Sequence, residues 1–400
     1  MKYVIVLGDG MADYSIEELD GKTPLEYAKT PVMDELAVKS EIGLVHTIPD
    51  GMSPGSDTAN LSVVGYDPKI YYSGRSPLEA LSIGVDMKPT DISFRCNIVT
   101  VSDDELPYEQ KTIIDHSSSE ISTEDAAVLL DAVKKELESD LYKFYVGTSY
   151  RHLTIWDKGE VVELTPPHDI LGKIIGEYLP KDRALYDMMK KSYDILNEHP
   201  INVERAKKGL NKANSIWFWG AGTRPALSSF EEKNHKKAAM ISAVDLLKGI
   251  AVGAGMTNIN VEGANGGLHT NYEGKANAAV KALVEDGFDF VYIHVEAPDE
   301  MGHQGSVERK VQSIEFLDEK VIKVVKEGLE EARVDFRMLV LPDHPTPICL
   351  RTHVNEAVPY MLYDSTDEKD GKYLYNEKDA KASGLYFEKG HTMVDHLFEK

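Results

Sequence analysis

The sequence predicts an α/β fold: a mostly parallel sheet flanked by helices, with a smaller α+β domain inserted into it. Three observations support this prediction. Short apolar runs at 3–7, 288–295 and 336–341 end in polar residues, as buried strands do. Amphipathic helical patterns separate these runs, which is typical of a parallel sheet. In the middle of the chain two strand-like runs flank a tight turn, and this indicates antiparallel pairing within an insertion.

Helices are predicted before the second and third of these strands. The segment NAAVKALVEDG, residues 277–287, has apolar residues at helical spacing directly ahead of the strand FDFVYIHV. This is the arrangement of a crossover helix between parallel strands. A second amphipathic stretch, from about 306 to 327, precedes the strand at 336. Both helices would pack their apolar faces on the sheet.

The middle of the chain has a different pattern. Ser122 and Asp125 form a capping box ahead of ISTEDAAVLLDAVKKEL, whose apolar positions share one helical face. The runs HLTIW (152–156) and VVEL (161–164) follow, and the turn between them predicts a hairpin. We therefore predict an inserted domain at 93–228 and a discontinuous core domain formed by 1–92 and 229–400.

Composition excludes several functional classes. The 400 residues carry 44 Lys and Arg against 67 Asp and Glu, a net charge of −23, so a nucleic-acid partner is not expected. The apolar run at the N-terminus is too short for a signal peptide or a membrane span, and Cys96 and Cys349 are too few for a disulfide framework. We expect a cytoplasmic protein without a membrane partner. An anionic substrate would need local cations to reverse the charge at its site.

Side chains that can bind metals follow each of the three core strands. Asp9 follows the first strand, Asp299 and His303 follow the second, and Asp343 and His344 follow the third. Parallel strands end at one edge of a sheet, which is where open α/β folds build their sites. Asp and His suit Zn²⁺ or Mn²⁺, and carboxylate-rich sets favour Mn²⁺. The sequence therefore predicts a metal site at this edge, with enough ligands for two ions.

Ser56 stands on a corner of the chain, in MSPGSDTANL, directly before a predicted helix. One interpretation is a helix cap, because Ser, Asp and Thr satisfy unpaired N–H groups at helix starts. The other is a nucleophile, because a helix N-terminus stabilises an anion such as phosphate. The two interpretations differ in which groups surround the hydroxyl.

Seven motifs carry a resemblance over nearly the whole chain. In order they are GDGMAD, PGSDTANLSVVGYDP, YYSGRSPLEA, FRCN, WFWGAGTRP, HVEAPDEMGHQG and LPDHPTP. The chain resembles the cofactor-independent phosphoglycerate mutases of the archaeal type, which belong to the alkaline phosphatase superfamily. The resemblance implies a phosphatase-like core, an inserted substrate-handling domain, a phosphoserine intermediate and two divalent cations, with no need for 2,3-bisphosphoglycerate. It implies Mn²⁺ or Zn²⁺, with Mg²⁺ as a further candidate.

The resemblance also implies roles for individual residues. Ser56 becomes the nucleophile and shares one metal with Asp9, Asp343 and His344. Asp299 and His303 bind the second metal with a further histidine, for which His353 and His391 compete. We favour His353, because it follows the strand bearing Asp343 by only ten residues, while His391 resembles the start of a terminal helix.

Cations that could bind a small phosphorylated hydroxy acid are Arg151 and Arg224 in the inserted segment and Lys248 in the core; surface charge is the alternative for each. His116 receives no role. The leading hypothesis is exchange of a phosphoryl group between 3-phosphoglycerate and 2-phosphoglycerate. A related phosphatase or phosphotransferase, such as the homoserine-kinase-like members of the group, is the second enzyme hypothesis. A metal- or anion-binding scaffold is the non-enzymatic one.

Overall fold

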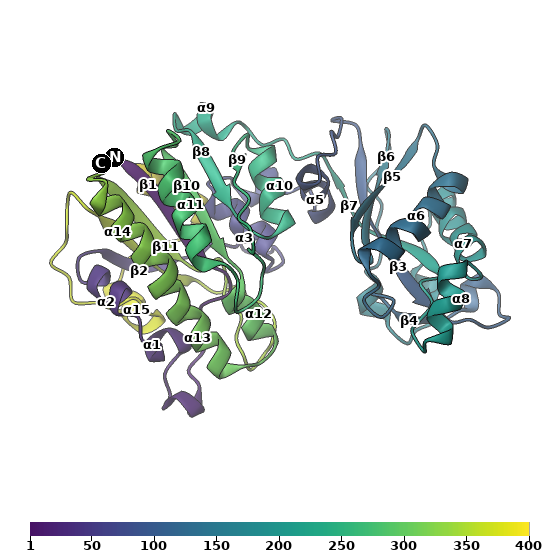
Figure 1. The fold of residues 1–400 in the computed structure, drawn as a ribbon, viewed down its shortest axis with the longest axis horizontal. Coiled ribbons are helices and arrows are strands. Elements are labelled where there is room, and N and C mark those ends of the chain that lie inside the picture. The colour runs from purple at the N-terminus through teal and green to yellow at the C-terminus, as the bar shows by residue number, and fades with distance from the viewer. Residues whose placement is uncertain (400) are drawn as a thin grey trace. The chain divides into compact units, whose positions relative to one another are not determined.

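The computed structural model describes residues 1–399 and divides the chain into two compact units (Figure 1). The first unit consists of Met1–Tyr72 and the chain from Ala226 onward, and the second of Ser73–Pro225. The second unit starts earlier than the insertion predicted at 93, because α5 (Arg75–Ser82) packs on strands β3 (Ile92–Val101) and β7 (Ser215–Thr223) of that unit. Within the described residues no helix has the length and apolar character that a membrane crossing requires.

An eight-stranded sheet forms the core of the first unit, in the order β13-β2-β12-β11-β1-β10-β8-β9. The strands β9, β8, β10, β1 and β11 are parallel, whereas β12 runs antiparallel to both β11 and β2. This is the mixed, mostly parallel sheet that the sequence predicts. The strands span Lys2–Gly8 (β1), Glu41–Val45 (β2), Ala238–Ile241 (β8), Thr257–Asn258 (β9), Phe290–Val295 (β10), Phe336–Leu341 (β11), Val358–Asp364 (β12) and Tyr386–Phe387 (β13).

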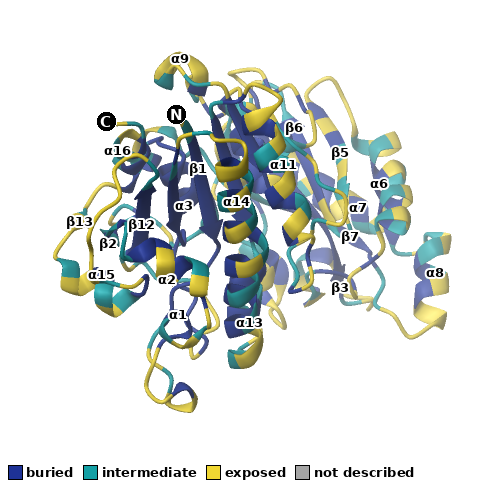
Figure 2. Cartoon of the chain, turned by 60° about the vertical axis from the view of Figure 1, so that its left-hand side comes forward, coloured by how far each residue is buried: buried dark blue, intermediate teal, exposed yellow. Residues whose placement is uncertain are grey.

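Helices cover both faces of this sheet (Figure 1), and its central strands are almost entirely buried (Figure 2). The helices α11, α13 and α14 pack on one face, and α3 and α10 lie on the other. The helices of the first unit are Pro24–Tyr27 (α1), Pro31–Ala37 (α2), Ser56–Val63 (α3), Pro68–Tyr71 (α4), Phe230–Asn234 (α9), Asp245–Gly253 (α10), Tyr272–Val284 (α11), Ala297–His303 (α12), Val307–Leu317 (α13), Lys323–Glu331 (α14), Glu377–Ser383 (α15) and Met393–Phe398 (α16).

The amphipathic stretch at 306–327 forms two helices rather than one continuous α-helix. A π-helical turn, Asp318–Ile322, separates α13 from α14. The carboxylate of Asp318 accepts N–H bonds from Val32 (3.2 Å) and Met33 (2.6 Å) at the start of α2. This contact supplies a partner for two N–H groups that a helix start leaves unpaired, and it joins two distant parts of the chain.

The second unit is α+β, as predicted for the insertion. Its strands β4, β3, β6 and β5 form an antiparallel sheet in this order, and β7 also pairs with β3. These strands span Ile92–Val101 (β3), Ile113–Asp115 (β4), Tyr142–Thr148 (β5), Arg151–Trp156 (β6) and Ser215–Thr223 (β7), and the helices beside α5 are Thr123–Leu137 (α6), Arg183–Leu196 (α7) and Pro200–Lys207 (α8).

Two local predictions in this unit have different outcomes. The side chain of Ser122 caps α6 by accepting the N–H of Asp125, as predicted. The hairpin between 152–156 and 161–164 is wrong, because 161–164 forms no strand. Instead β6 pairs with β5 on one edge and with β3 on the other, so neither edge is left for a further strand.

Candidate active site

Three neighbouring strands end in step at one edge of the eight-stranded sheet. β1 lies between β10 and β11 and is parallel to both, with Leu7 opposite His294 on one side and Leu341 on the other. The residues that follow these strands therefore meet at one edge, as predicted. They include the candidate ligands Asp9, Asp299, His303, Asp343 and His344.

Asp9, Asp343 and His344 form a first cluster of buried side chains. One donor atom from each lies within 4.8 Å of the others. The Nε2 atom of His344 is 3.5 Å from Oδ1 of Asp9 and 3.4 Å from Oδ2 of Asp343. Two carboxylates and an imidazole at this spacing are a donor set suited to Mn²⁺ or Zn²⁺.

The helix α3 brings Ser56 to the first cluster. The Ser56 hydroxyl lies 3.1 Å from Nε2 of His344. The residue that caps α3 is Gly55, so Ser56 is the first helical residue, and its side chain contacts an imidazole rather than a helix amide. The capping interpretation of Ser56 is therefore contradicted. The hydroxyl is directed at the same imidazole nitrogen that the two carboxylates surround.

Asp299, His303 and His353 form a second cluster. Within α12, Nε2 of His303 is 3.2 Å from Oδ2 of Asp299. Nε2 of His353 is 3.2 Å from Oδ1 of Asp299 and 3.0 Å from Nε2 of His303. His391 lies elsewhere in the first unit, with its Nε2 atom 4.0 Å from Oδ2 of Asp67. Of the two competing histidines, the structure brings His353 to Asp299.

Asp9 has an electrostatic environment that favours a bound cation. Burial raises the pKa of Asp9 well above its ordinary value, and the charges of Asp343 and Asp299 raise it further. Oδ2 of Asp9 lies 2.9 Å from Nε2 of His294, whereas Oδ1 is buried without a hydrogen-bond partner. A cation at Oδ1 would supply the missing partner and offset the clustered negative charge.

The second cluster carries a different charge balance. The hydrogen bond between His303 and Asp299 raises the pKa of His303 to about 9. Burial raises the pKa of Asp299, but the hydrogen bonds from His303 and His353, together with the charges of His344 and His353, hold it well below its ordinary value. Protons and metal ions compete for the same imidazole nitrogens, so binding a metal here would release protons.

Several residues around the clusters were not found from the sequence. Nδ2 of Asn60 donates to Oδ2 of Asp343, and the Thr346 hydroxyl contacts both Asp299 and Nδ1 of His344. His294, which contacts Asp9, is a polar residue within an otherwise apolar strand, and this was the one signal available in the sequence. Asn60 resembled an ordinary helix residue, although it stands one turn after Ser56.

Two lysines of the core differ in burial. The predicted Lys248 lies on α10, half-buried, with its Nζ atom 3.8 Å from Oδ1 of Asp245. Lys275 on α11 is fully buried and donates to the backbone carbonyl of His294 at 2.9 Å. Burial lowers the pKa of Lys275 to about 8. A buried lysine thus contacts the strand residue that holds Asp9, a position that helical periodicity alone did not distinguish from the surface.

The predicted arginines belong to the second unit. Arg151 begins β6 and is exposed, with its guanidinium 5.1 Å from the ring centre of Tyr150. Arg224 follows β7 and is exposed. His116, which received no role, lies in the same unit with its ring centre 5.8 Å from that of Tyr150 and 6.1 Å from that of His168. The ring of Tyr150 thus contacts both the Arg151 guanidinium and the His116 imidazole.

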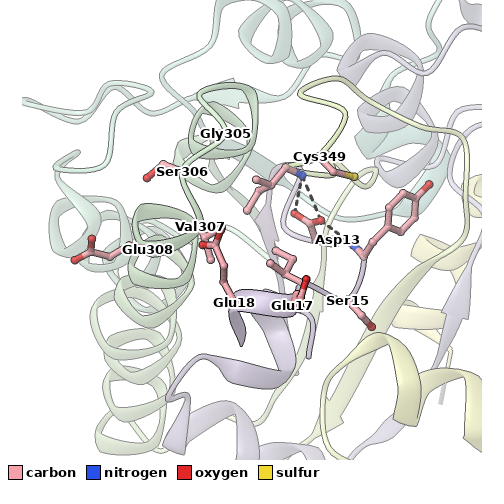
Figure 3. A pocket seen from close by; sticks show the side chains of 12 residues that line it. Asp13, Ser15, Glu17, Glu18, Gly305, Ser306, Val307, Glu308 and Cys349 are labelled. Atoms are coloured by element: carbon pink, nitrogen blue, oxygen red, sulfur yellow. Dashed lines mark hydrogen bonds between the residues drawn. The ribbon is translucent and has the colours of Figure 1, made fainter. Parts of the chain in front are cut away.

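A cavity of about 610 Å³ in the first unit lies beside Asp13 (Figure 3). Asp13 accepts N–H bonds from Tyr14 and Ile348 and pairs with Lys310 at 2.8 Å. The cavity lining includes none of the residues of the two clusters. Its charged side chains are the carboxylates of Asp13, Glu17, Glu18 and Glu308. An anionic substrate finds no opposite charge in this lining, so the clusters at the strand ends are the better candidate site.

Comparisons with known proteins agree on one family. A family model described as 2,3-bisphosphoglycerate-independent phosphoglycerate mutase matches residues 37–202. A protein of Methanosarcina barkeri with that name is 47% identical over 99% of both chains. A probable 2,3-bisphosphoglycerate-independent phosphoglycerate mutase of Geobacter sulfurreducens is 45% identical over the full length of both chains.

Solved structures give the same result for the fold. The PH0037 protein from Pyrococcus horikoshii matches with a TM-score of 0.83 and 31% identity, over 99% of this chain and 96% of that one. The cofactor-independent phosphoglycerate mutase from Thermoplasma acidophilum matches with a TM-score of 0.67 and 27% identity, over 99% of both chains. The likeness includes both units of the chain.

Proposed function

Because this chain belongs to the family of 2,3-bisphosphoglycerate-independent phosphoglycerate mutases, we propose that it interconverts 3-phosphoglycerate and 2-phosphoglycerate through a phosphoserine at Ser56. The enzyme is then an isomerase whose substrate and product are small anionic hydroxy acids. The observation that carries the proposal is the position of the Ser56 hydroxyl, 3.1 Å from Nε2 of His344 within a cluster of metal-competent side chains.

The residues of the two clusters fit divalent metal ions. The unpartnered Oδ1 atom of Asp9 supports this fit, as do the donor groups Asp9–Asp343–His344 and Asp299–His344–His353. His303 adds a further nitrogen beside Asp299 and His353. Asp9, Ser56, Asp343 and His344 would hold one ion, and Asp299, His303 and His353 the other, with Mn²⁺ or Zn²⁺ as the best candidates. When bound, such ions favour the ionised form of a serine hydroxyl and offset the charge of a phosphoryl group.

The proposed exchange has two balanced steps. In the first, Oγ of Ser56 bonds to phosphorus, the bond from phosphorus to O3 of the substrate breaks, and the proton lost from Ser56 ends on that O3. In the second, O2 of the same glycerate bonds to phosphorus, the bond to Oγ breaks, and the O2 proton returns to Ser56. No water is consumed, so the site must exclude water between the steps or it becomes a phosphatase.

Retaining glycerate between the two steps requires cations that bind its carboxylate. Arg151 and Arg224 of the second unit are our candidates, since a guanidinium binds a carboxylate or phosphate through two parallel hydrogen bonds. Lys248 of the core is the candidate for the phosphoryl group, and its half-buried position on α10, a helix that contacts α3, supports this role. With these assignments, the carboxylate and the phosphoryl group of the substrate each have a proposed cationic partner.

The proposal is tested with 3-phosphoglycerate and Mn²⁺, using enolase to report formation of 2-phosphoglycerate. We expect turnover without added 2,3-bisphosphoglycerate, and rapid quenching with labelled substrate should leave phosphate on Ser56. Little inorganic phosphate should appear during turnover. Release of inorganic phosphate at the rate of substrate loss would instead indicate a phosphatase. Turnover without any phosphorylated Ser56 would contradict the proposed intermediate.

A further inference from the structure

The amide of Asn60 joins the helix of the proposed nucleophile to a residue of the first cluster. Its Nδ2 atom donates to the backbone carbonyl of Ser56 at 2.9 Å and to Oδ2 of Asp343 at 2.8 Å. Its Oδ1 atom accepts the Tyr292 hydroxyl at 2.6 Å. Asn60 is fully buried, and its bonds to Asp343 and Tyr292 are buried, while the bond to the Ser56 carbonyl is part-buried.

The surroundings allow this amide only one orientation. If the amide were turned over, its oxygen would face the carbonyl of Ser56 and the carboxylate of Asp343, and both are acceptors. Tyr292 lies on β10, a central strand of the sheet, and its hydroxyl is the donor that Oδ1 requires. The sheet therefore determines the direction in which Asn60 presents its two N–H groups.

Asp343 is held from more than one direction. Its Oδ1 atom accepts N–H bonds from Gly10 at 3.1 Å and from His344 at 3.0 Å, both in the loops that follow β1 and β11. The Oδ2 atom of Asp343 accepts its bond from Asn60, a residue of α3. A single side chain thus relates the position of Ser56 to that of Asp343, through a bond between Asn60 and Asp343 that spans 283 residues of sequence.

We infer that Asn60 is a positioning residue for phosphoryl transfer, which sets the Ser56 hydroxyl against the metal-binding face of Asp343 through its two N–H donors. The inference rests on the proposed function. Asn60 has no exposed surface and is not offered as a contact of the substrate. Its loss should therefore lower kcat and weaken metal binding at the first cluster, while KM for 3-phosphoglycerate stays nearly constant. Partners that orient metal ligands typically change affinity or activity by about 10- to 100-fold.

The experiment compares three variants of the full-length enzyme. Asn60→Ala removes both donors, and Tyr292→Phe leaves Asn60 in place but removes the hydroxyl that orients it. Asn202→Ala is the matched control: Asn202 is equally buried and also donates to two carbonyls, those of Leu196 and Ala213, in the second unit. Each variant is measured for its unfolding midpoint, for kcat and KM, and for Mn²⁺ binding by calorimetric titration of the metal-free protein.

We expect Asn60→Ala to lower kcat by about 10- to 100-fold and to weaken one of two Mn²⁺ equivalents by about 10-fold, with KM within about twofold. Tyr292→Phe should cause a smaller loss of the same kind, and it decides the question if Asn60→Ala does not fold. Asn202→Ala should lose stability but keep kcat and Mn²⁺ affinity.

Two results would overturn the inference. The first is a folded Asn60→Ala enzyme with wild-type kcat and Mn²⁺ affinity, or the same result for Tyr292→Phe if Asn60→Ala does not fold. The second is a loss of kcat in Asn202→Ala equal to that in Asn60→Ala. If wild-type protein has no mutase activity, the proposed function fails, and the Mn²⁺ titration still decides the role of Asn60 at the first cluster.

Discussion

The imidazole of His344 stacks on that of His353, with ring centres 3.8 Å apart and an angle of 25° between the planes. His344 belongs to the first cluster and contacts Ser56, while Nε2 of His353 lies 3.2 Å from Asp299 in the second. The two rings therefore place the clusters next to each other. Neighbouring metal sites of this kind can bind the attacking and the leaving oxygen of one phosphoryl group.

The histidine of the second cluster is tested by counting metal equivalents. We expect His353→Ala to lose one of two Mn²⁺ equivalents, because it removes a nitrogen 3.2 Å from Asp299. His391→Ala is a matched control, since the exposed fractions of the two side chains are close, 20% for His353 and 23% for His391. Metal analysis after dialysis gives the count. A loss confined to the His391 variant would show that the second cluster is assigned to the wrong histidine.

Ser56→Ala should separate chemistry from stability. The hydroxyl makes no capping bond, so we expect the free energy of unfolding to change by less than about 0.5 kcal/mol, below the cost of losing a cap. Turnover should nearly vanish, because no other hydroxyl occupies this position. Ser62→Ala makes the same change on the same helix, at a hydroxyl without a hydrogen-bond partner, and should keep turnover. Wild-type turnover in Ser56→Ala would remove the nucleophile from the mechanism.

Metal removal should abolish activity and lower stability together. Buried Asp9, Asp299 and Asp343 then lose the cations that offset their charge. We expect dialysis against a chelator to stop turnover and added Mn²⁺ to restore it. At free Mn²⁺ about 100 times the Kd, one bound ion stabilises the native state by about 2.7 kcal/mol, which calorimetric melting would detect. Full activity of a demonstrably metal-free protein would exclude the two-metal proposal.

The buried carboxyl of Asp318 makes stability depend on pH. Burial raises the pKa of Asp318 to about 6, against an ordinary value of 3.8, although N–H bonds from Met33 and Val32 oppose the rise. Between these values the native chain binds more protons than the unfolded chain. The contribution of this group is therefore present below pH 3.8 and lost as pH rises through about 6.

Denaturant titrations between pH 4 and pH 7 measure this dependence. Asp318→Asn should make the slope of unfolding free energy against pH less negative in that range, by at most about 1.4 kcal/mol per pH unit. The absolute stability of the variant also changes, because the Asn amide cannot accept from both backbone N–H groups, so only the slope is diagnostic. Glu327→Gln removes a charge from an exposed residue of α14 and serves as the control. An unchanged slope in Asp318→Asn would contradict the raised pKa.

Much of the site could be predicted because its signals are local in sequence. Asp9, Asp299 and Asp343 each follow an apolar run, and parallel strands that end together bring such residues to one edge. Other features had no local signal. The predicted hairpin at 152–164 has the expected turn residues. It was wrong because both edges of β6 pair with other strands, β5 and β3.

The sequence by itself determined the α/β class, three central strands of the core sheet and the candidate ligands, because hydrophobic periodicity and strand-end polar residues depend on neighbours along the chain. The tertiary structure alone decided which histidine approaches Asp299 and which groups surround Ser56. The bonds of Asn60 to Asp343 and Tyr292 join residues far apart in the chain. Such bonds follow from the order in which strands pair and the face on which a helix packs. These relations are set by the folding of the whole core, and no short stretch of sequence contains them.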